Sequence, residues 1–176
     1  MVGCINLPTR IELGHIGAID GWFPRTETMP RGVSNQADYF SGHYVAYGLN
    51  IQAMCDPDLV FMYVAVAGTG KINDSHAFSR CTGLIEWFVT LPDWCFVSAD
   101  NAYPPTRKML VPHNATELLS EYHRTYNFYL SQLRIRIEMA FGRLTTKWRR
   151  LRTTLNFHSA KNANIIRVCT KLHNYV

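Results

Sequence analysis

The sequence predicts an α/β domain in which helices pack on a mixed β-sheet, and three observations lead to this fold class. Short apolar segments end at Asp-Gly or Asp-Asn pairs, which is typical of buried strands that stop at a turn. Two longer segments rich in β-branched and aromatic residues flank a tripeptide of turn residues, which predicts a hairpin. The C-terminal third carries apolar residues at spacings of three and four, the pattern of amphipathic helices.

Composition and length favour one globular domain over residues 1–176. Of the 176 residues, 47% are hydrophobic and 18% are charged. The longest apolar run, residues 59–68, is much shorter than the roughly 20 residues that a membrane-spanning helix needs. The N-terminus lacks a basic segment followed by an apolar one, so no secretory signal is predicted. We therefore expect an intracellular protein that does not enter a membrane.

Three strands are predicted in the first 70 residues. Residues 16–19 form a short apolar strand that ends at Asp20. Residues 43–55 and 59–67 form a hairpin around the turn tripeptide Asp56-Pro57-Asp58.

A helix and a fourth strand follow the hairpin. Asp74 is a good N-cap residue and begins a helix over residues 74–87. A short apolar strand over residues 94–99 then ends at Asp100, and two prolines shortly afterwards prevent its continuation.

The rest of the chain is predicted to be a loop and two helices. Residues 103–126 contain prolines and little periodicity, so they are interpreted as a loop. A long helix begins at Asn127, and a last helix capped by Ser159 follows it. The apolar stripe of the long helix consists of Leu130, Leu133, Ile137, Phe141, Leu144, Trp148 and Leu151.

Three carboxylates are candidates for one site. The helix between the third and fourth predicted strands makes a crossover, so the strands that end at Asp20 and Asp100 are expected to be parallel and to end at the same sheet edge. Glu138 lies at the border of the long helix's apolar stripe, where it can lean over that edge. Spacing alone favours a simpler explanation of Glu138, an ion pair with Arg134 four residues earlier. If the three acids converge, they supply the hard oxygen ligands that two divalent cations need in a two-metal phosphodiester site.

The charge distribution indicates a polyanion partner. Residues 1–121 hold seven Lys and Arg against 12 Asp and Glu, whereas residues 122–176 hold 11 against one, for an overall net charge of +5. Nucleic acid is the first candidate partner, although solvated helix faces would give the same count. The candidate DNA-binding residues are Arg134, Arg143, Lys147, Arg149, Arg150 and Arg152.

Six motifs in the same order resemble the DDE superfamily endonuclease domain of PIF/Harbinger transposases. They are Gly17-Ala18-Ile19-Asp20-Gly21, residues 47–53 with Cys55-Asp56, Gly70 with Asn73-Asp74-Ser75, residues 99–104, residues 137–144 and Leu172-His173-Asn174. The resemblance implies an RNase H-like fold, with a hairpin, a crossover helix, a parallel strand and long C-terminal helices. It also implies a Mg²⁺- or Mn²⁺-dependent endonuclease that cleaves DNA and transfers a 3′-hydroxyl end to target DNA.

The resemblance also assigns roles to residues. Asp20, Asp100 and Glu138 are the catalytic and metal-binding acids it implies. Asp74 is either a fourth acid near the metal ions or only a helix cap. The implied partner is DNA in the nucleus, and the family pattern leaves room for a homo-oligomer and for a separate DNA-binding protein that supplies target recognition.

Two departures from the family pattern lead to an alternative function. Relatives carry Thr-His where this chain has Trp22-Phe23, and the first aspartate falls so early that the family's N-terminal helix-turn-helix region is expected to be absent. The alternative is therefore a catalytically inactive, transposase-derived module that binds DNA or another protein.

Overall fold

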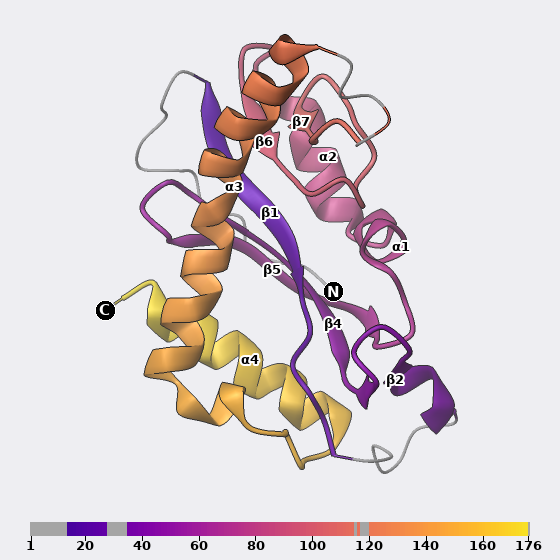
Figure 1. The fold of residues 1–176 in the computed structure, drawn as a ribbon. Helices are drawn as coiled ribbons and strands as arrows, with labels where there is room; N and C mark the ends of the chain where they lie inside the picture. The colour runs from indigo at the N-terminus through magenta and orange to yellow at the C-terminus, as the bar shows by residue number, and fades with distance from the viewer. Residues whose placement is uncertain (1–13, 28–34, 115, 117–119, 176) are drawn as a thin grey trace.

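A five-stranded mixed sheet forms the centre of the molecule (Figure 1). The computed structural model describes residues 14–27, 35–114, 116 and 120–175. In order across the sheet the strands are β5 (Phe61–Thr69), β4 (Leu49–Cys55), β1 (His15–Trp22), β6 (Phe96–Ser98) and β7 (Met109–Leu110). β4 pairs antiparallel with β1 and β5, whereas β6 pairs parallel with β1 and β7. This order and these directions are those of an RNase H-like sheet, so the predicted fold class is confirmed.

The predicted hairpin is formed by β4 and β5. Asp56 closes its turn, because its buried Oδ1 accepts hydrogen bonds from the backbone N–H groups of Asp58 and Val60, each at 2.9 Å. The hairpin's first strand begins at Leu49, not at residue 43. The preceding residues instead form the 3₁₀ helix η1 (Gln36–Tyr39) and a second, small hairpin of β2 (Phe40–Ser41) and β3 (Ala46–Tyr47).

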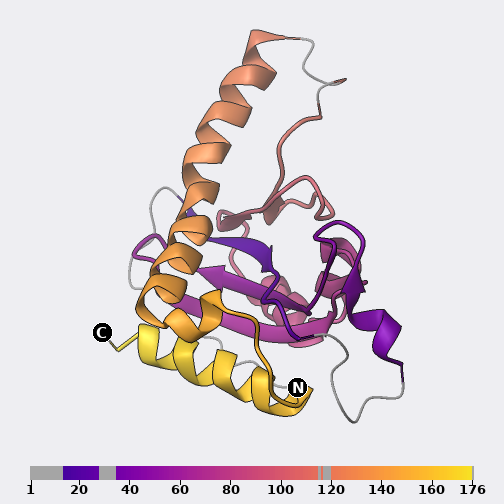
Figure 2. The same ribbon diagram turned by 60° about the horizontal axis from the view of Figure 1, so that its bottom comes forward.

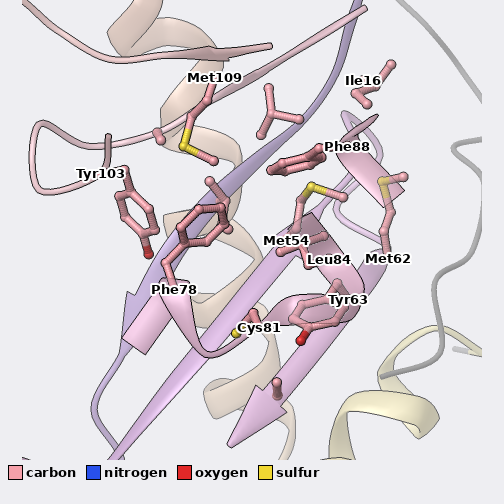
Figure 3. Packing of buried hydrophobic residues seen from close by; sticks show 14 of the residues in the cluster. Ile16, Met54, Met62, Tyr63, Phe78, Cys81, Leu84, Phe88, Tyr103 and Met109 are labelled. Atoms are coloured by element: carbon pink, nitrogen blue, oxygen red, sulfur yellow. The ribbon is translucent and has the colours of Figure 1, made fainter. Parts of the chain in front are cut away.

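Two short helices, α1 (Asp74–Ser79) and α2 (Thr82–Thr90), cover one face of the sheet where one helix over residues 74–87 was predicted. The helical conformation breaks at Cys81, whose ψ of 57° is not helical. The break lets side chains from both helices enter one core (Figure 3). Phe78 of α1 and Phe88 of α2 pack with their ring centroids 6.2 Å apart in this core.

The opposite face is covered by α3 (Glu121–Lys147) and α4 (Ser159–His173). α3 begins six residues before the predicted Asn127, with Ser120 as its N-cap, and its N-terminal half extends beyond the sheet (Figure 2). The 3₁₀ helix η3 (Arg149–Arg152) follows α3, and His158 rather than Ser159 caps α4. Among the described helices, none combines the length and apolarity needed to cross a membrane.

The last residues of α4 fasten it to the sheet. The Asn174 side chain accepts a hydrogen bond from the Phe61 backbone N–H at 2.9 Å and donates one to the Phe61 carbonyl at 2.8 Å, as a neighbouring strand would. His173 Nε2 lies 3.1 Å from the Leu59 carbonyl oxygen. The Leu172-His173-Asn174 motif therefore has a structural role at the start of β5.

Candidate active site

Asp20 lies within β1, because the strand runs past the predicted end to Trp22. β4 pairs with β1 as far as Trp22, whereas β6 pairs with β1 only as far as Ala18. Asp20 therefore lies where β1 and β6 separate at the edge of the sheet. Its side chain is 20% exposed, and Oδ1 accepts a hydrogen bond from the Gly21 backbone N–H at 2.8 Å.

Asp100 lies beside Asp20 because their strands are parallel neighbours. Ala18 is in register with Ser98, and each aspartate lies two residues further along its strand. Asp100 begins a turn in which its Oδ1 accepts a hydrogen bond from the Asn101 backbone N–H at 2.6 Å. The prediction that the Asp20 and Asp100 strands are parallel neighbours is confirmed.

Arg134 links Glu138 to Asp20. Its Nη1 lies 2.8 Å from Glu138 Oε1 and 3.7 Å from Asp20 Oδ2. The ion pair within α3 that the sequence offered as a simple explanation of Glu138 is therefore present. The same guanidinium also contacts Asp20, so Glu138 faces the sheet edge that carries the two aspartates.

Asp74 does not cap α1, which corrects the capping explanation. The N-cap is Asn73, whose side chain accepts a hydrogen bond from the His76 backbone N–H at 2.9 Å. Asp74 Oδ1 instead accepts hydrogen bonds from Asn50 Nδ2 at 2.9 Å and Gln52 Nε2 at 3.1 Å, both on β4.

The position of Asp74 is fixed by a buried polar network. Gln52 is fully buried and accepts a hydrogen bond from the Tyr103 hydroxyl at 2.6 Å. Gly21 leaves room for Asp74, because a Cβ at Gly21 would lie only 2.0 Å from Asp74 Oδ1. Asn50 and Gln52 are the site residues that sequence reasoning missed, although two amides in an otherwise apolar buried strand must find hydrogen-bond partners.

Burial and neighbouring charge change the titration of Asp20. Its pKa is raised from 3.8 to about 6; burial is the largest cause, and the negative charges of Asp74 and Asp100 act in the same direction. The hydrogen bond from Gly21 and the positive charge of Arg134 act in the opposite direction. Both Asp74 and Asp100 are thus close enough to act on Asp20 electrostatically.

The carboxylates fit divalent cations in chemistry but do not form a closed cage. Hard oxygen ligands with several negative charges suit Mg²⁺ and Mn²⁺. Within residues 14–27, 35–114, 116 and 120–175, no three His, Cys, Asp or Glu side chains lie close enough to hold a metal ion ready-made. In this arrangement Arg134 provides positive charge between Asp20 and Glu138.

The candidate DNA-binding residues divide into separate groups. Arg134 contacts the acids, whereas Arg143 and Lys147 line a cavity of about 620 Å³ together with Asp58 and His173. Lys147 lies nine residues after Glu138, about 180° around the helix. The remaining candidates, Arg149, Arg150 and Arg152, lie in η3.

Arg150 is engaged within its own segment. Its guanidinium donates hydrogen bonds to the Asn156 side chain and, at 3.4 Å, to Thr153 Oγ1. It also lies 5.5 Å from the centroid of the Phe157 ring. These contacts orient the guanidinium along the chain that connects η3 to α4.

Trp22 at the end of β1 and Phe23 directly after it stand where the family pattern has Thr-His, and both make aromatic contacts. The Trp22 ring stacks on Phe141 of α3, with centroids 5.8 Å apart. The Phe23 ring stacks on Tyr44 of the small hairpin, with centroids 4.5 Å apart. The aromatic pair therefore fastens α3 and the small hairpin to the strand that carries Asp20.

The fold and the arrangement of the acids together define an RNase H-like domain with acidic side chains where the central strands β1 and β6 end their pairing. A family model of the DDE superfamily endonucleases matches residues 19–174, a range that includes all four acids. The chain belongs to the DDE superfamily endonuclease family. No curated protein and no solved structure matches it.

Proposed function

We propose that this chain is the catalytic domain of a divalent-metal-dependent DNA endonuclease of the transposase type. The observation that carries the proposal is the meeting of Asp20 with Asp100 through strand register and with Glu138 through Arg134. These acids come from two strands and a helix that are distant in sequence. A solvated surface would not require three carboxylates to approach one another, since their mutual repulsion is unfavourable.

In the proposed reaction, Asp20, Asp100 and Glu138 hold Mg²⁺ or Mn²⁺ through their carboxylate oxygens. Bound cations of this kind activate the attacking water or hydroxyl and stabilise the leaving oxygen of a phosphodiester. Asp74, held by Asn50 and Gln52, adds a fourth negative charge beside Asp20. Arg134 balances the charge of the acids before cations bind and can then turn to a DNA phosphate.

The finer parts of the proposal come from the family. Transfer of a 3′-hydroxyl end to target DNA, a nuclear location, a homo-oligomer and a separate DNA-binding protein are proposed on that basis. DNA contact by the basic residues of α3 and η3 is proposed from their charge. Their separation into groups means that a DNA duplex that reaches the acids need not contact all of them.

The alternative function is an inactive module that retains the fold and binds DNA or a protein. It is favoured by the lack, among the described residues, of a ready-made cluster of three metal-binding side chains. In such a module Arg134 would be a permanent substitute for the metal ions, as it contacts both Glu138 and Asp20.

A plasmid-nicking assay decides between the two functions. We expect the wild-type chain to convert supercoiled plasmid to nicked circles with Mn²⁺ or Mg²⁺ and to stop when EDTA is added. Nicking that persists in EDTA would indicate a contaminating or metal-independent activity. Binding of DNA without nicking in either metal would support the inactive module.

Arg134→Gln is expected to increase the response of the protein to Mn²⁺. Cations must displace the guanidinium from Glu138 or Asp20, and these partly exposed ion pairs are worth about 1 kcal/mol together. Losing them should tighten Mn²⁺ binding about fivefold. The measurement is the melting temperature as a function of Mn²⁺ concentration.

Arg136→Gln is the matched control, because it removes the same charge from an exposed position on α3. Equal Mn²⁺ responses of the Arg134 and Arg136 variants would mean that the Arg134 ion pairs do not compete with cations.

A further inference from the structure

An exposed aromatic ring lies beside the acids and has no role in the proposed function so far. Tyr44 lies in the turn between β2 and β3, and 47% of the residue is exposed. Its ring is stacked on Phe23, with 14° between the ring planes, and His43 meets it at 83° with centroids 4.7 Å apart. Nearly half of Tyr44 is thus open to solvent although two rings contact it.

Phe23 supports Tyr44 from beneath. A Cβ at Gly48 would lie 2.4 Å from the Phe23 ring and one at Gly70 would lie 2.8 Å from it, so the ring rests directly on the backbone of both glycines. Because Phe23 rests on this backbone and stacks on Tyr44, the Tyr44 ring is held in place before any ligand arrives. A ring that is already ordered loses less conformational entropy when it binds a ligand.

The stacked pair is close to the acids. Phe23 follows Asp20 by three residues along the continuation of β1. The charges of Asp74 and Asp20 reach the Tyr44 hydroxyl, since both raise the pKa of Tyr44 after burial, which is the largest cause. Aromatic surface is therefore presented next to the place where the scissile phosphate would lie.

We propose that Tyr44 stacks on an unpaired nucleobase of the DNA strand held at the acids, an inference that rests on the proposed endonuclease function. Acidic side chains repel the phosphates on either side of the reacting one. Holding the strand there therefore requires contacts to parts of the DNA that carry no negative charge. Stacking of a base on an aromatic ring is such a contact, and it tolerates any base. The base must be unpaired and out of the helical stack, because only then is its face available to the ring.

A hydrogen bond from the Tyr44 hydroxyl to a phosphate would be a different use of the same residue. Tyr44→Phe retains the ring and loses the hydroxyl, whereas Tyr44→Ala loses both. Stacking predicts that Tyr44→Phe binds single-stranded DNA within about twofold of the wild-type chain, and that Tyr44→Ala binds about 5- to 150-fold more weakly. A phosphate contact predicts that both variants lose affinity to the same extent.

The measurement is fluorescence anisotropy of a labelled single-stranded oligonucleotide with the full chain in Ca²⁺. Tyr122→Ala is the matched control, because Tyr122 is also exposed, at 75%, but lies in the first turn of α3, far along the helix from Glu138. Wild-type affinity of Tyr44→Ala would overturn the stacking proposal, as would equal losses in Tyr44→Ala and Tyr44→Phe. Melting temperatures identify a folding defect, and Tyr44→Leu then replaces Tyr44→Ala.

Abasic substitutions in the oligonucleotide test the same contact without changing the protein. One abasic position should weaken binding by the wild-type chain and have little effect on Tyr44→Ala, because the two changes remove the same stack. Equal losses for both proteins at every position would overturn the proposal. Nicking by the wild-type chain is measured separately. If the wild-type chain nicks plasmid but Tyr44→Ala binds DNA normally, only the stacking proposal is wrong. If the binding data show the stack but the wild-type chain does not nick, only the endonuclease proposal is wrong.

Discussion

Asp20→Asn is expected to lower the metal-dependent nicking rate by about 10³-fold. Asparagine keeps the shape of the side chain but removes the charge that would hold the cations. Metal stabilisation of the transition state is worth several kcal/mol, and each loss of about 1.4 kcal/mol lowers the rate tenfold. Asp20 is the acid most closely connected to the others. It contacts Arg134, which also contacts Glu138, and its pKa responds to both Asp74 and Asp100.

Initial rates of plasmid nicking in Mn²⁺ measure this loss. Asp100→Asn and Glu138→Gln should lose activity similarly, since each removes a proposed ligand. Glu86→Gln provides the matched control, because Glu86 is exposed on α2 and its replacement removes the same charge. If Asp20→Asn nicked within about tenfold of the wild-type rate, the acids could not be the metal ligands.

Much of the site's framework could be predicted because the relevant signals are local in sequence. The strand that carries Asp20 and the strand before Asp100 are short apolar segments, and the handedness of crossovers makes such strands parallel. α3 was recognised from an apolar stripe that does face the core, where Ile137, Ala140 and Leu144 are buried. Those two features placed Asp20, Asp100 and Glu138 on the elements where they are found.

The position of Asp74 could not be predicted from local sequence. An Asp-Ser pair before an apolar segment has the pattern of a helix cap, and only the fold reveals that Asn73 caps α1. What holds Asp74 is a pair of amides more than 20 residues earlier, on β4. Asn50 and Gln52 are two residues apart and so lie on the same side of the strand, which is the signal that was available.

Two-residue strands and the part of α3 that lies beyond the sheet could not be predicted either. β2, β3 and β7 have two residues each, too few to show an alternating pattern. The first turns of α3 lie beyond the sheet, and Leu130 is the first residue of that helix to be buried. A helix segment without a buried face has no apolar period, so the start at Glu121 could not be inferred from the stripe.

The stability of the metal-free protein is expected to fall as the pH rises from about 4 to about 6. Burial, the largest cause, raises the pKa of Asp20 from 3.8 to about 6 in the folded chain. Between these values the folded state binds more protons than the unfolded state, so the free energy of unfolding decreases with pH. Once Asp20 has ionised, at neutral pH, the free energy of unfolding is lower by up to about 3 kcal/mol than it is near pH 4.

Comparison with Asp20→Asn isolates this contribution. Burial lowers the pKa of His173, which makes the protein less stable at acid pH, so the two groups act in opposite directions in the wild-type profile. The variant keeps His173 and all other titrating groups, so the difference between the two proteins reports Asp20 together with its charge interactions with Arg134, Asp74 and Asp100. Urea unfolding at a series of pH values in EDTA should show Asp20→Asn to be the more stable protein at pH 7, by up to about 3 kcal/mol, with the advantage disappearing near pH 4.

Mn²⁺ should reverse the order at pH 7, because only the wild-type chain gains stability from bound cations. Parallel pH profiles for the two proteins would mean that Asp20 ionises as easily in the folded chain as in the unfolded one, and that the acids are not held together at the cost of stability.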